Sequence, residues 1–414
     1  MSDVIKGNAV IGQSGGPTAV INQSLVGVIE SLAGSTVVGR LLGARHGVRG
    51  IVEEKFTDLK GLPQDLLERV AVTPCAALGS TRDKPNAAYC HNIFKVFAKN
   101  NVRYFFYIGG NDSADTARIV SELAKAENYE LRVFHVPKTI DNDLRLTDHC
   151  PGYGSAARFV ASAIAGDDRD NASLPGVKID VIMGRNAGWL TAASVLCRAD
   201  QADGPHLVYV PECPLTEQRF IDEVAEVYGR LGRCLVAMSE GVEGADGMSW
   251  GERLALEAEK SGHGKVERDN HGNVQLSGSG ALGDAMAEIV KTKVAAKLGK
   301  EKLRVRSDTF GYLQRSFAGY VSPVDQAEAR LAGRKAVEYA MAGIHDGTVA
   351  FRRITTGGKY AIECFRGELS DVARDTKDLP REFINAAGNG ITQAFIDYAL
   401  PLVGELPVIG KLPT

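Results

Sequence analysis

The chain has 414 residues, 44% of them hydrophobic and 24% charged, values that are typical of a globular protein and unlike those of disordered or collagen-like chains. Its 48 Lys and Arg residues nearly balance 51 Asp and Glu residues, so the net charge of −3 does not favour nucleic acid or a membrane surface as a partner. The length predicts two domains.

Short runs rich in Val, Ile, Tyr and Phe recur along the chain between longer segments of helical periodicity. This alternation predicts parallel sheets built from βαβ units. Most runs end in a glycine or a charged residue, at the edge where open α/β sheets bind their ligands. The predicted strands are residues 9–11, 104–108, 132–136, 179–183, 207–210 and 235–238.

The first predicted strand leads into a glycine turn that contains Gly15 and Gly16. Pro17 follows near the first turn of a predicted helix, whose apolar stripe runs from Ile21 to Leu32. The N–H groups at such a helix start can bind phosphate, but the same turn serves equally well as a chain reversal. It matches neither the dinucleotide-binding consensus nor the P-loop.

A second glycine turn, residues 109–113, follows the strand at 104–108 and opens another predicted helix. Two such turns facing one ligand would form a double phosphate site. Asp112 and Ser113 could instead be N-cap residues of the helix, a position that Asp and Ser favour.

Residues 137–143 carry the most informative chemistry, because they set Lys138, Asp141 and Asp143 on one turn after the strand at 132–136. Phosphoryl transfer needs a cation on the developing charge and a carboxylate that accepts the proton of the acceptor, and this turn offers both. Taken singly, Lys138 could be a solvated lysine and the two aspartates could be turn formers. Their agreement with two glycine turns favours a site.

Charged groups also follow the predicted strands of the C-terminal half. Arg185 comes after the fourth strand, where it could bind an anion or only the carbonyls at the strand end. Glu240, after the sixth strand, could accept hydrogen bonds from sugar hydroxyls. Arg306 and the segment 311–315 offer two guanidiniums to a terminal phosphate.

The seven cysteines form no Cys-x-x-Cys pair, and the histidines, His46, His149 and His206 among them, show no metal-ligand spacing. An odd number of cysteines, no apolar leader and no apolar stretch of membrane length favour a cytoplasmic protein. Residues 241–283, rich in Gly, Ser, His and Asp, are predicted to be a mobile insertion or a hairpin. Residues 400–414 are predicted to pack as an extended strap.

Taken together, these motifs resemble the 6-phosphofructokinase family in order and spacing over roughly residues 8–330. The most specific are Thr-Ile-Asp-Asn-Asp, which begins at Thr139, and Met-Gly-Arg, which begins at Met183. The other matching segments are residues 15–16, 78–82, 109–113, 239–241 and 311–315.

The resemblance implies the phosphofructokinase fold: two Rossmann-like, three-layer αβα domains with mainly parallel sheets. Residues 1–150 and approximately 314–375 would form the donor-binding domain. Residues of approximately 151–313 and 376–414 would form the domain that binds fructose 6-phosphate.

The resemblance also implies the reaction, a phosphoryl transfer to the 1-hydroxyl of fructose 6-phosphate with Asp141 as the proton acceptor. The donor would be bound by Gly15, Gly16, Arg82, Gly110 and Ser113. The sugar phosphate would be bound by Thr139, Ile140, Asp141, Met183, Gly184, Arg185, Glu240, Arg306, Tyr312 and Arg315, the 6-phosphate by Arg306, Tyr312 and Arg315.

Two positions indicate which donor is used. ATP-using relatives have glycine where this chain has Asp112 and Lys138, which looks like the pyrophosphate-dependent branch. The Asp112 carboxylate would repel the α-phosphate of ATP, while Lys138 would stabilise the transferring group between donor and acceptor. Because pyrophosphate lies close to a sugar phosphate in group-transfer potential, the reaction should run in both directions, in glycolysis and in gluconeogenesis.

The family implies Mg²⁺, and the expected ligands are Asn111, Asp112 and Asp143, although relatives usually have a carboxylate at the first of these positions. The basic residue that relatives carry before the Met-Gly-Arg strand is not evident, and Lys178 is a candidate substitute. Family members share the sugar site across subunits, so we expect a homodimer. Two alternatives stay open: an ATP-dependent kinase of the same fold, and a sensor that binds the sugar phosphate without turnover.

Overall fold

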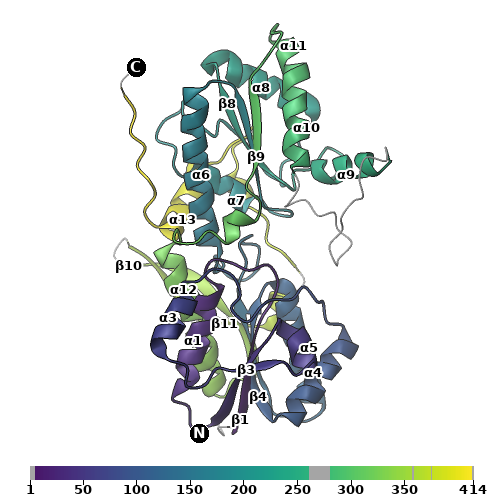
Figure 1. Ribbon diagram of the computed structural model, residues 1–414, viewed down its shortest axis with the longest axis vertical. Helices are drawn as coiled ribbons and strands as arrows, with labels where there is room; N and C mark the ends of the chain where they lie inside the picture. Colours follow the sequence, from purple (N-terminus) through teal and green to yellow (C-terminus); the bar gives the residue numbers. More distant parts are fainter. Residues whose placement is uncertain (1–4, 261–279, 357–358, 374, 413–414) are drawn as a thin grey trace. The chain divides into compact units, whose positions relative to one another are not determined.

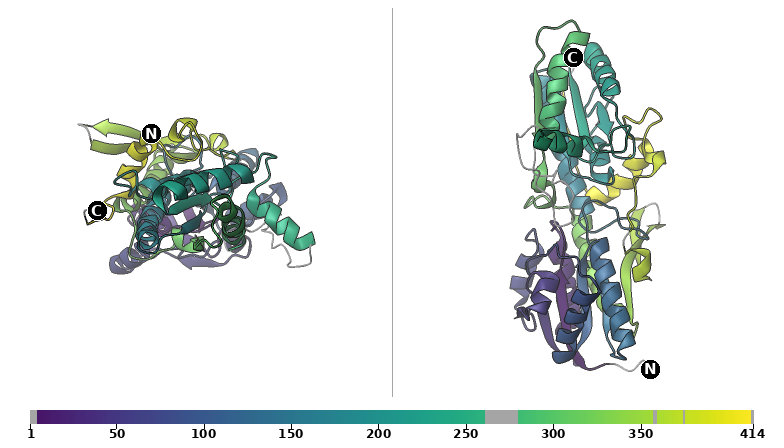
Figure 2. Two further views of the ribbon diagram at one scale, coloured as in Figure 1. Left: turned by 90° about the horizontal axis from the view of Figure 1, so that it is seen from above. Right: turned by 90° about the vertical axis from the view of Figure 1, so that its right-hand side faces the viewer.

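The computed structural model describes residues 5–260, 280–356, 359–373 and 375–412, which form two compact units (Figures 1 and 2). Unit 1 contains Met1–Ser155 and Arg315–Lys377, and unit 2 contains Ala156–Gln314 and Asp378–Thr414. The expected domain limits, near residues 150, 314 and 375, lie a few residues from these bounds. The substrate of each domain stays a prediction.

Unit 1 is built on a seven-stranded sheet in the order β11-β10-β5-β4-β1-β2-β3. The five strands from β10 to β2 run parallel, and β3 and β11 are antiparallel additions at the two edges. The strands are β1 (Gly7–Gln13), β2 (Val38–Ala44), β3 (Phe56–Asp58), β4 (Val102–Gly109), β5 (Arg132–Pro137), β10 (Asp346–Thr356) and β11 (Lys359–Gly367).

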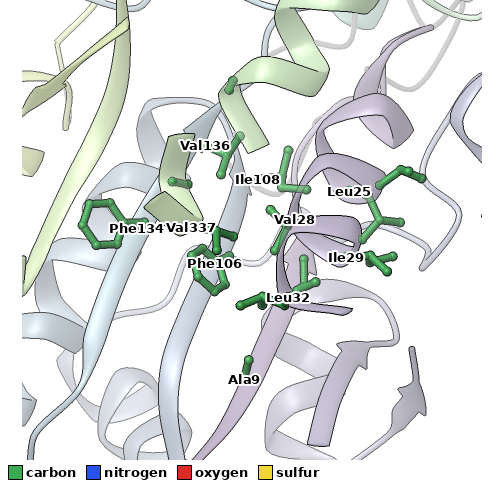
Figure 3. Close-up of a cluster of buried hydrophobic side chains, with 14 of the residues drawn as sticks. Ala9, Leu25, Val28, Ile29, Leu32, Phe106, Ile108, Phe134, Val136 and Val337 are labelled. Carbon is green, nitrogen blue, oxygen red and sulfur yellow. The ribbon is translucent and has the colours of Figure 1, made fainter. Parts of the chain in front are cut away.

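Helices cover both faces of this sheet, because successive residues of a strand point to opposite faces and both faces are apolar. In β4, Phe106 and Ile108 pack against α1 and α12 on one face (Figure 3), while Phe105 and Tyr107 pack with α2, α4 and α5 on the other. The helices are α1 (Ile21–Ala33), α2 (Gly47–Val52), α3 (Gln64–Ala71), α4 (Ala87–Lys99), α5 (Asn111–Ala126) and α12 (Pro323–Met341).

Unit 2 has a parallel four-stranded sheet in the order β7-β8-β6-β9. Its strands are β6 (Val177–Ile182), β7 (Leu207–Tyr209), β8 (Cys234–Ser239) and β9 (Val305–Thr309). Its helices are α6 (Tyr153–Ser173), α7 (Trp189–Ala192), α8 (Glu217–Leu231), α9 (Trp250–Lys260), α10 (Ala281–Ile289), α11 (Ala295–Lys297) and α13 (Gln393–Val403). The two units together confirm the predicted mainly parallel α/β class.

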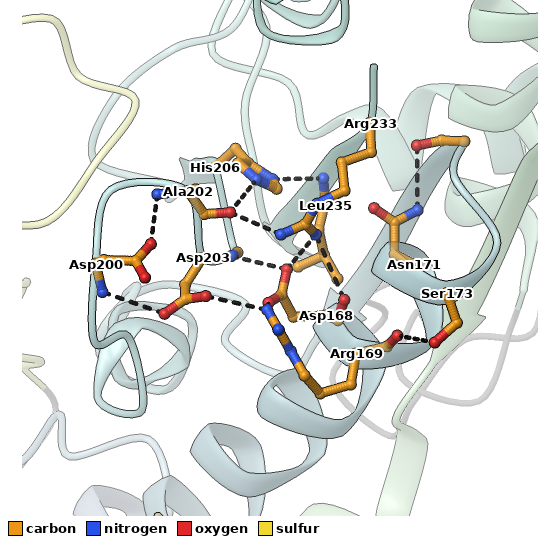
Figure 4. A network of polar contacts seen from close by, with 12 residues as sticks. Asp168, Arg169, Asn171, Ser173, Asp200, Ala202, Asp203, His206, Arg233 and Leu235 are labelled. Carbon is orange, nitrogen blue, oxygen red and sulfur yellow. Dashed lines mark hydrogen bonds and ion pairs between the residues drawn. The ribbon is translucent and has the colours of Figure 1, made fainter. Parts of the chain in front are cut away.

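A polar network closes the end of the unit 2 sheet where β7 and β8 begin (Figure 4). The buried Asp168 of α6 accepts hydrogen bonds from Gly204 N at 2.8 Å and from Arg233, and Arg169 joins it to Asp203. Asp203 also pairs with Lys411 near the C-terminus. Since parallel strands bind ligands at their carboxyl ends, this network lies at the opposite edge and stabilises the unit.

Each of the six predicted strands is present, but several elements differ from expectation. Helix α1 begins at Ile21, so Pro17 lies four residues before its first residue. Residues 241–283 include all of α9 and the start of α10, so these parts are helical, while 261–279 lie outside the described residues. Helix α13 continues through Pro401 to Val403, which corrects the start of the predicted strap.

Candidate active site

Three loops of unit 1 lie side by side because β1, β4 and β5 are neighbours in the parallel sheet. Gln13 pairs with Ile108 across β1 and β4, and Gly109 pairs with Pro137 across β4 and β5. Backbone hydrogen bonds then hold the loops together beyond the strand ends, from Ser14 N to Ile108 O at 2.9 Å and from Lys138 N to Gly109 O at 2.9 Å. Both glycine turns and the 137–143 turn therefore meet at one edge, as predicted.

Lys138 reaches from the third loop to the first. Its side chain is buried, 3% exposed, and Nζ donates a hydrogen bond to Gly16 O at 2.6 Å. Gly15 has φ +75°, and a Cβ there would also lie 3.2 Å from Lys138 Nζ, so only glycine suits this position. A Cβ on Gly16 would lie 2.5 Å from Arg315 Nη1. The structure thus brings Arg315, predicted for the 6-phosphate, beside the glycine turn.

The charges around Lys138 are unevenly matched. Burial and the guanidiniums of Arg315 and Arg82 lower its pKa to about 8, although the carboxylates of Asp141 and Asp143 act in the opposite direction. A buried ammonium next to two guanidiniums is costly in a free protein and favourable once a polyanion is bound. This arrangement makes the three loops a candidate anion site.

The turn that carries the two aspartates is held by its own side chains. Asp141 N donates to Thr139 Oγ1 at 3.1 Å, and Asn142, in the left-handed conformation at φ 56°, accepts a hydrogen bond from Cys150 N at 3.0 Å. Asn tolerates this conformation better than most residues. Burial and the neighbouring Asp141 raise the pKa of Asp143 to about 7.

The second glycine turn opens α5. Gly110 is the N-cap, so Asp112 and Ser113 lie inside the first turn, and their alternative as N-cap residues is wrong. Ser113 is buried, and a Cβ on Gly109 would overlap its Oγ. Asp112 is half exposed and pairs with Lys84 at 3.1 Å.

Asn111 stands at the first position of α5 and is bonded to its own neighbour. Its Oδ1 accepts a hydrogen bond from Asp112 N at 2.9 Å. Asn111 and Asp112 thus offer an amide and a carboxylate oxygen at the start of α5, beside the loop that carries Asp143.

Two residues that the sequence did not single out, the partly buried Lys377 and the buried His135, hold these loops. Lys377 donates from its backbone N to Asp143 O at 2.7 Å, and from Nζ to Thr147 O at 3.0 Å and Asp148 O at 2.9 Å. His135 bridges Gly109 O and Thr348 Oγ1, each at 2.8 Å. Burial lowers the pKa of His135 to about 4, so the ring is neutral.

Unit 2 gathers most of the remaining predicted residues at the carboxyl ends of β6 and β8, which pair in parallel. Gly184 has φ +143°, and Ser239 Oγ donates to its carbonyl at 2.5 Å. Glu240 is buried, and its N donates to Ile182 O at 2.9 Å. Met183 N donates to Gln314 Oε1 at 3.2 Å, which ties the Met-Gly-Arg turn to the segment 311–315.

The other predicted sugar-site residues are placed as follows. Arg306 lies on β9 and is exposed, and Tyr312, 38% exposed, lies in the 3-10 turn Gly311–Arg315. Lys178, the candidate for the missing basic residue, is only 8% exposed and is paired with Asp167 and Asp308, so that role stays a prediction. None of the described helices is both long and apolar enough to span a membrane.

Comparison with known proteins identifies the family. Residues 8–340 match the Phosphofructokinase family model. The chain is 52% identical to the pyrophosphate–fructose 6-phosphate 1-phosphotransferase of Rhodospirillum rubrum over 97% of this chain and 95% of the relative, and 35% identical to the protein of that name from Xanthomonas campestris over 97% and 93%. The crystal structure of a pyrophosphate-dependent phosphofructokinase from Marinobacter aquaeolei, 32% identical, superposes with a TM-score of 0.82 over 97% of this chain and 93% of that one. The chain belongs to the phosphofructokinase family.

Proposed function

We propose that the protein transfers a phosphoryl group reversibly from pyrophosphate to the 1-hydroxyl of fructose 6-phosphate, with Mg²⁺, and gives fructose 1,6-bisphosphate and phosphate. The observation that carries this proposal is the buried ammonium of Lys138, bonded to Gly16 O and flanked by Arg315 and Arg82. Such a cluster neutralises a small, highly charged donor. When no donor is bound, the positive charge of the cluster is unmatched.

In this proposal Asp141 accepts the proton of the sugar 1-hydroxyl as the oxygen attacks the donor phosphorus. The chain supports that role because Thr139 Oγ1 fixes the backbone of Asp141, so the carboxylate needs little reorganisation before reaction. Lys138 stabilises the charge on the transferring group. Arg315 lies close enough to Lys138 to share this task, in addition to the role on the 6-phosphate predicted from the sequence.

We assign the recognition of the sugar phosphate to Thr139, Ile140 and the unit 2 residues Met183, Gly184, Arg185, Glu240, Arg306 and Tyr312. The buried Glu240 follows β8 directly, where a carboxylate can accept hydrogen bonds from sugar hydroxyls. Gly15, Gly16, Gly110 and Ser113 supply backbone and hydroxyl groups to pyrophosphate.

The oxygen ligands that Mg²⁺ prefers are available in unit 1. Burial and the neighbouring Asp141 raise the pKa of Asp143, and a divalent cation beside it would favour the ionised form. Asn111 and Asp112 offer further oxygens at the start of α5. When bound, Mg²⁺ supplies positive charge to the phosphate oxygens.

The donor preference follows from Asp112 and Lys138. Asp112 stands in the first turn of α5, where its charge disfavours a third phosphate, the α-phosphate of ATP, and the nucleoside beyond it. Its pairing with Lys84 removes only part of that repulsion, because both side chains are about half exposed and the pair is solvent-screened. We further propose that the protein is a homodimer and that it is cytoplasmic. Its seven free cysteines are in keeping with the reducing conditions of the cytoplasm.

The test is formation of fructose 1,6-bisphosphate from fructose 6-phosphate and Mg²⁺, with pyrophosphate and ATP offered separately at equal concentration. Turnover with pyrophosphate alone is expected. Turnover with ATP alone would contradict the proposed donor without affecting the family assignment. Binding of fructose 6-phosphate without turnover would indicate a sensor.

The double variant Asp112→Gly, Lys138→Gly tests the donor assignment from the other side. It should lose pyrophosphate use and gain use of ATP relative to the parent protein. If ATP use does not rise, these two residues do not determine the choice of donor.

A further inference from the structure

Unit 2 contains three carboxylates that the proposed reaction does not use. Asp167 of α6, Asp180 of β6 and Asp308 of β9 each place a carboxylate oxygen within 4.8 Å of those of the other two. The three residues come from three different elements, so the cluster joins the helix and both strands.

Strand register explains why they meet. β6 and β9 are parallel, with Asp180 opposite Asp308 and Lys178 opposite Arg306. Because side chains alternate between faces, Lys178 and Asp180 lie on one face of β6. Asp167 contributes the third carboxylate from α6.

Asp180 is the unusual member. It is completely buried, and neither of its carboxylate oxygens has a hydrogen-bond partner among the described residues. Buried carboxylates are normally paired or coordinate a metal ion, since an unpaired one is costly. Asp167 is partly exposed and Asp308 is 60% exposed at its side chain, so solvent and ions can reach the cluster from that side.

Lys178 alone does not satisfy the cluster. Its Nζ pairs with Asp308 and lies 3.4 Å from Asp167, but it is 4.0 Å from Asp180, too far for a hydrogen bond. With all three carboxylates ionised, one ammonium leaves two negative charges. A divalent cation would bring the sum to zero.

We infer that Asp167, Asp180 and Asp308 bind a divalent cation that prefers oxygen ligands, such as Mn²⁺, Mg²⁺ or Ca²⁺, and that the flexible Lys178 side chain moves toward solvent when the ion binds. The ion joins α6, β6 and β9. Since Arg306 lies two residues before Asp308 on β9, the ion also fixes the strand that carries a predicted phosphate-binding guanidinium. This site is separate from the Mg²⁺ of the proposed reaction.

The experiment measures Mn²⁺ binding by equilibrium dialysis on the full chain without sugar phosphate or pyrophosphate, so its outcome is independent of the proposed function. Asp143→Asn is used as the background, which removes one expected ligand of the reaction site. On this background Lys178→Met should bind Mn²⁺ more tightly, because it removes a competing cation. Adding Asp180→Asn should weaken binding by about tenfold or more, since ligand charge sets affinity for such ions.

Asp308→Asn provides a second variant at an exposed position, where misfolding is not a concern, and it should weaken Mn²⁺ binding in the same way. Mn²⁺ should also raise the Tm of the Lys178→Met protein and not that of the Asp180→Asn or Asp308→Asn proteins. Equal Mn²⁺ binding with and without Asp308→Asn in the Lys178→Met protein would overturn the inference and leave the cluster as a lysine ion pair with a shared proton.

Discussion

Replacing Lys138 with methionine should make the protein more stable and less active. The pKa of Lys138 is lowered from 10.5 to about 8, so its charged form is less favourable by roughly 3 kcal/mol than a lysine in water, at 1.36 kcal/mol per unit. The variant loses the hydrogen bond to Gly16 O, which contributes about 1 kcal/mol. The free energy of unfolding of unit 1 at pH 7 should therefore rise by about 2 kcal/mol.

The pH dependence has a definite sign. Between pH 8 and 10.5 the unfolded chain keeps the Lys138 proton that the folded chain has lost, so the unfolded state binds more protons. The stability of the parent protein should then rise with pH across this interval, and Lys138→Met should remove that rise. Turnover with pyrophosphate should fall by about 10²–10³-fold, as when one charge-stabilising donor is removed.

The effect is measured by urea unfolding followed by far-UV circular dichroism. Tryptophan fluorescence is unsuitable, because both tryptophans, Trp189 and Trp250, belong to unit 2 and do not report on unit 1. Lys377→Met is the matched control. Its ammonium is partly buried and donates to two carbonyls, so its loss should destabilise unit 1 by about 1–3 kcal/mol. A Lys138→Met protein that is less stable than the parent at pH 7, or that keeps the alkaline rise, would refute the reasoning.

Three further outcomes are expected. Asp141→Ala should reduce kcat by about 10²–10⁴-fold and leave fructose 6-phosphate binding, measured by calorimetry, largely in place; a near-normal kcat would remove Asp141 from the mechanism. Gly109→Ala should lower the free energy of unfolding by about 1–3 kcal/mol, because the new Cβ overlaps Ser113 Oγ. The control Gly166→Ala, for which the structure places no atom within 4 Å of the new Cβ, should be neutral or stabilising. Thermal melts measure both variants. Although burial opposes this shift, two flanking carboxylates raise the pKa of His149. His149 therefore contributes stability that is complete below its unfolded pKa and is lost as pH rises through its folded pKa. His149→Gln should flatten this part of the pH–stability curve, and an unchanged curve would contradict the assignment.

The sequence predicted six of the strands, because each is a compact apolar run beside a segment of helical periodicity. It did not predict β2, β3, β9, β10 or β11. Of these, β10 and β11 carry Arg352, Arg353 and Glu363 in a long antiparallel pair, so their apolar density is low. Their pairing partners, not their composition, make them strands.

The same distinction applies to the site. Lys138, Asp141 and Asp143 are close together in the sequence, so their chemistry could be recognised from the residues alone. Lys377 is 230 residues from Thr147, and Thr348 is 213 residues from His135, so no local pattern indicates that they support the same loops. Long-range packing of this kind requires the tertiary structure.

Unit 1 is made of two chain segments with most of unit 2 between them in the sequence, which matters for biosynthesis. The edge of β5 has no strand partner until β10 is made, and His135 meets Thr348 only after 213 further residues. At a synthesis rate of about 5–20 residues per second, that edge waits roughly 10–40 s on the ribosome. The α1 face that α12 later covers is left open for a similar time. A nascent chain in this condition exposes both an unpaired strand and an apolar surface, which are features that favour holding by chaperones before unit 1 can close.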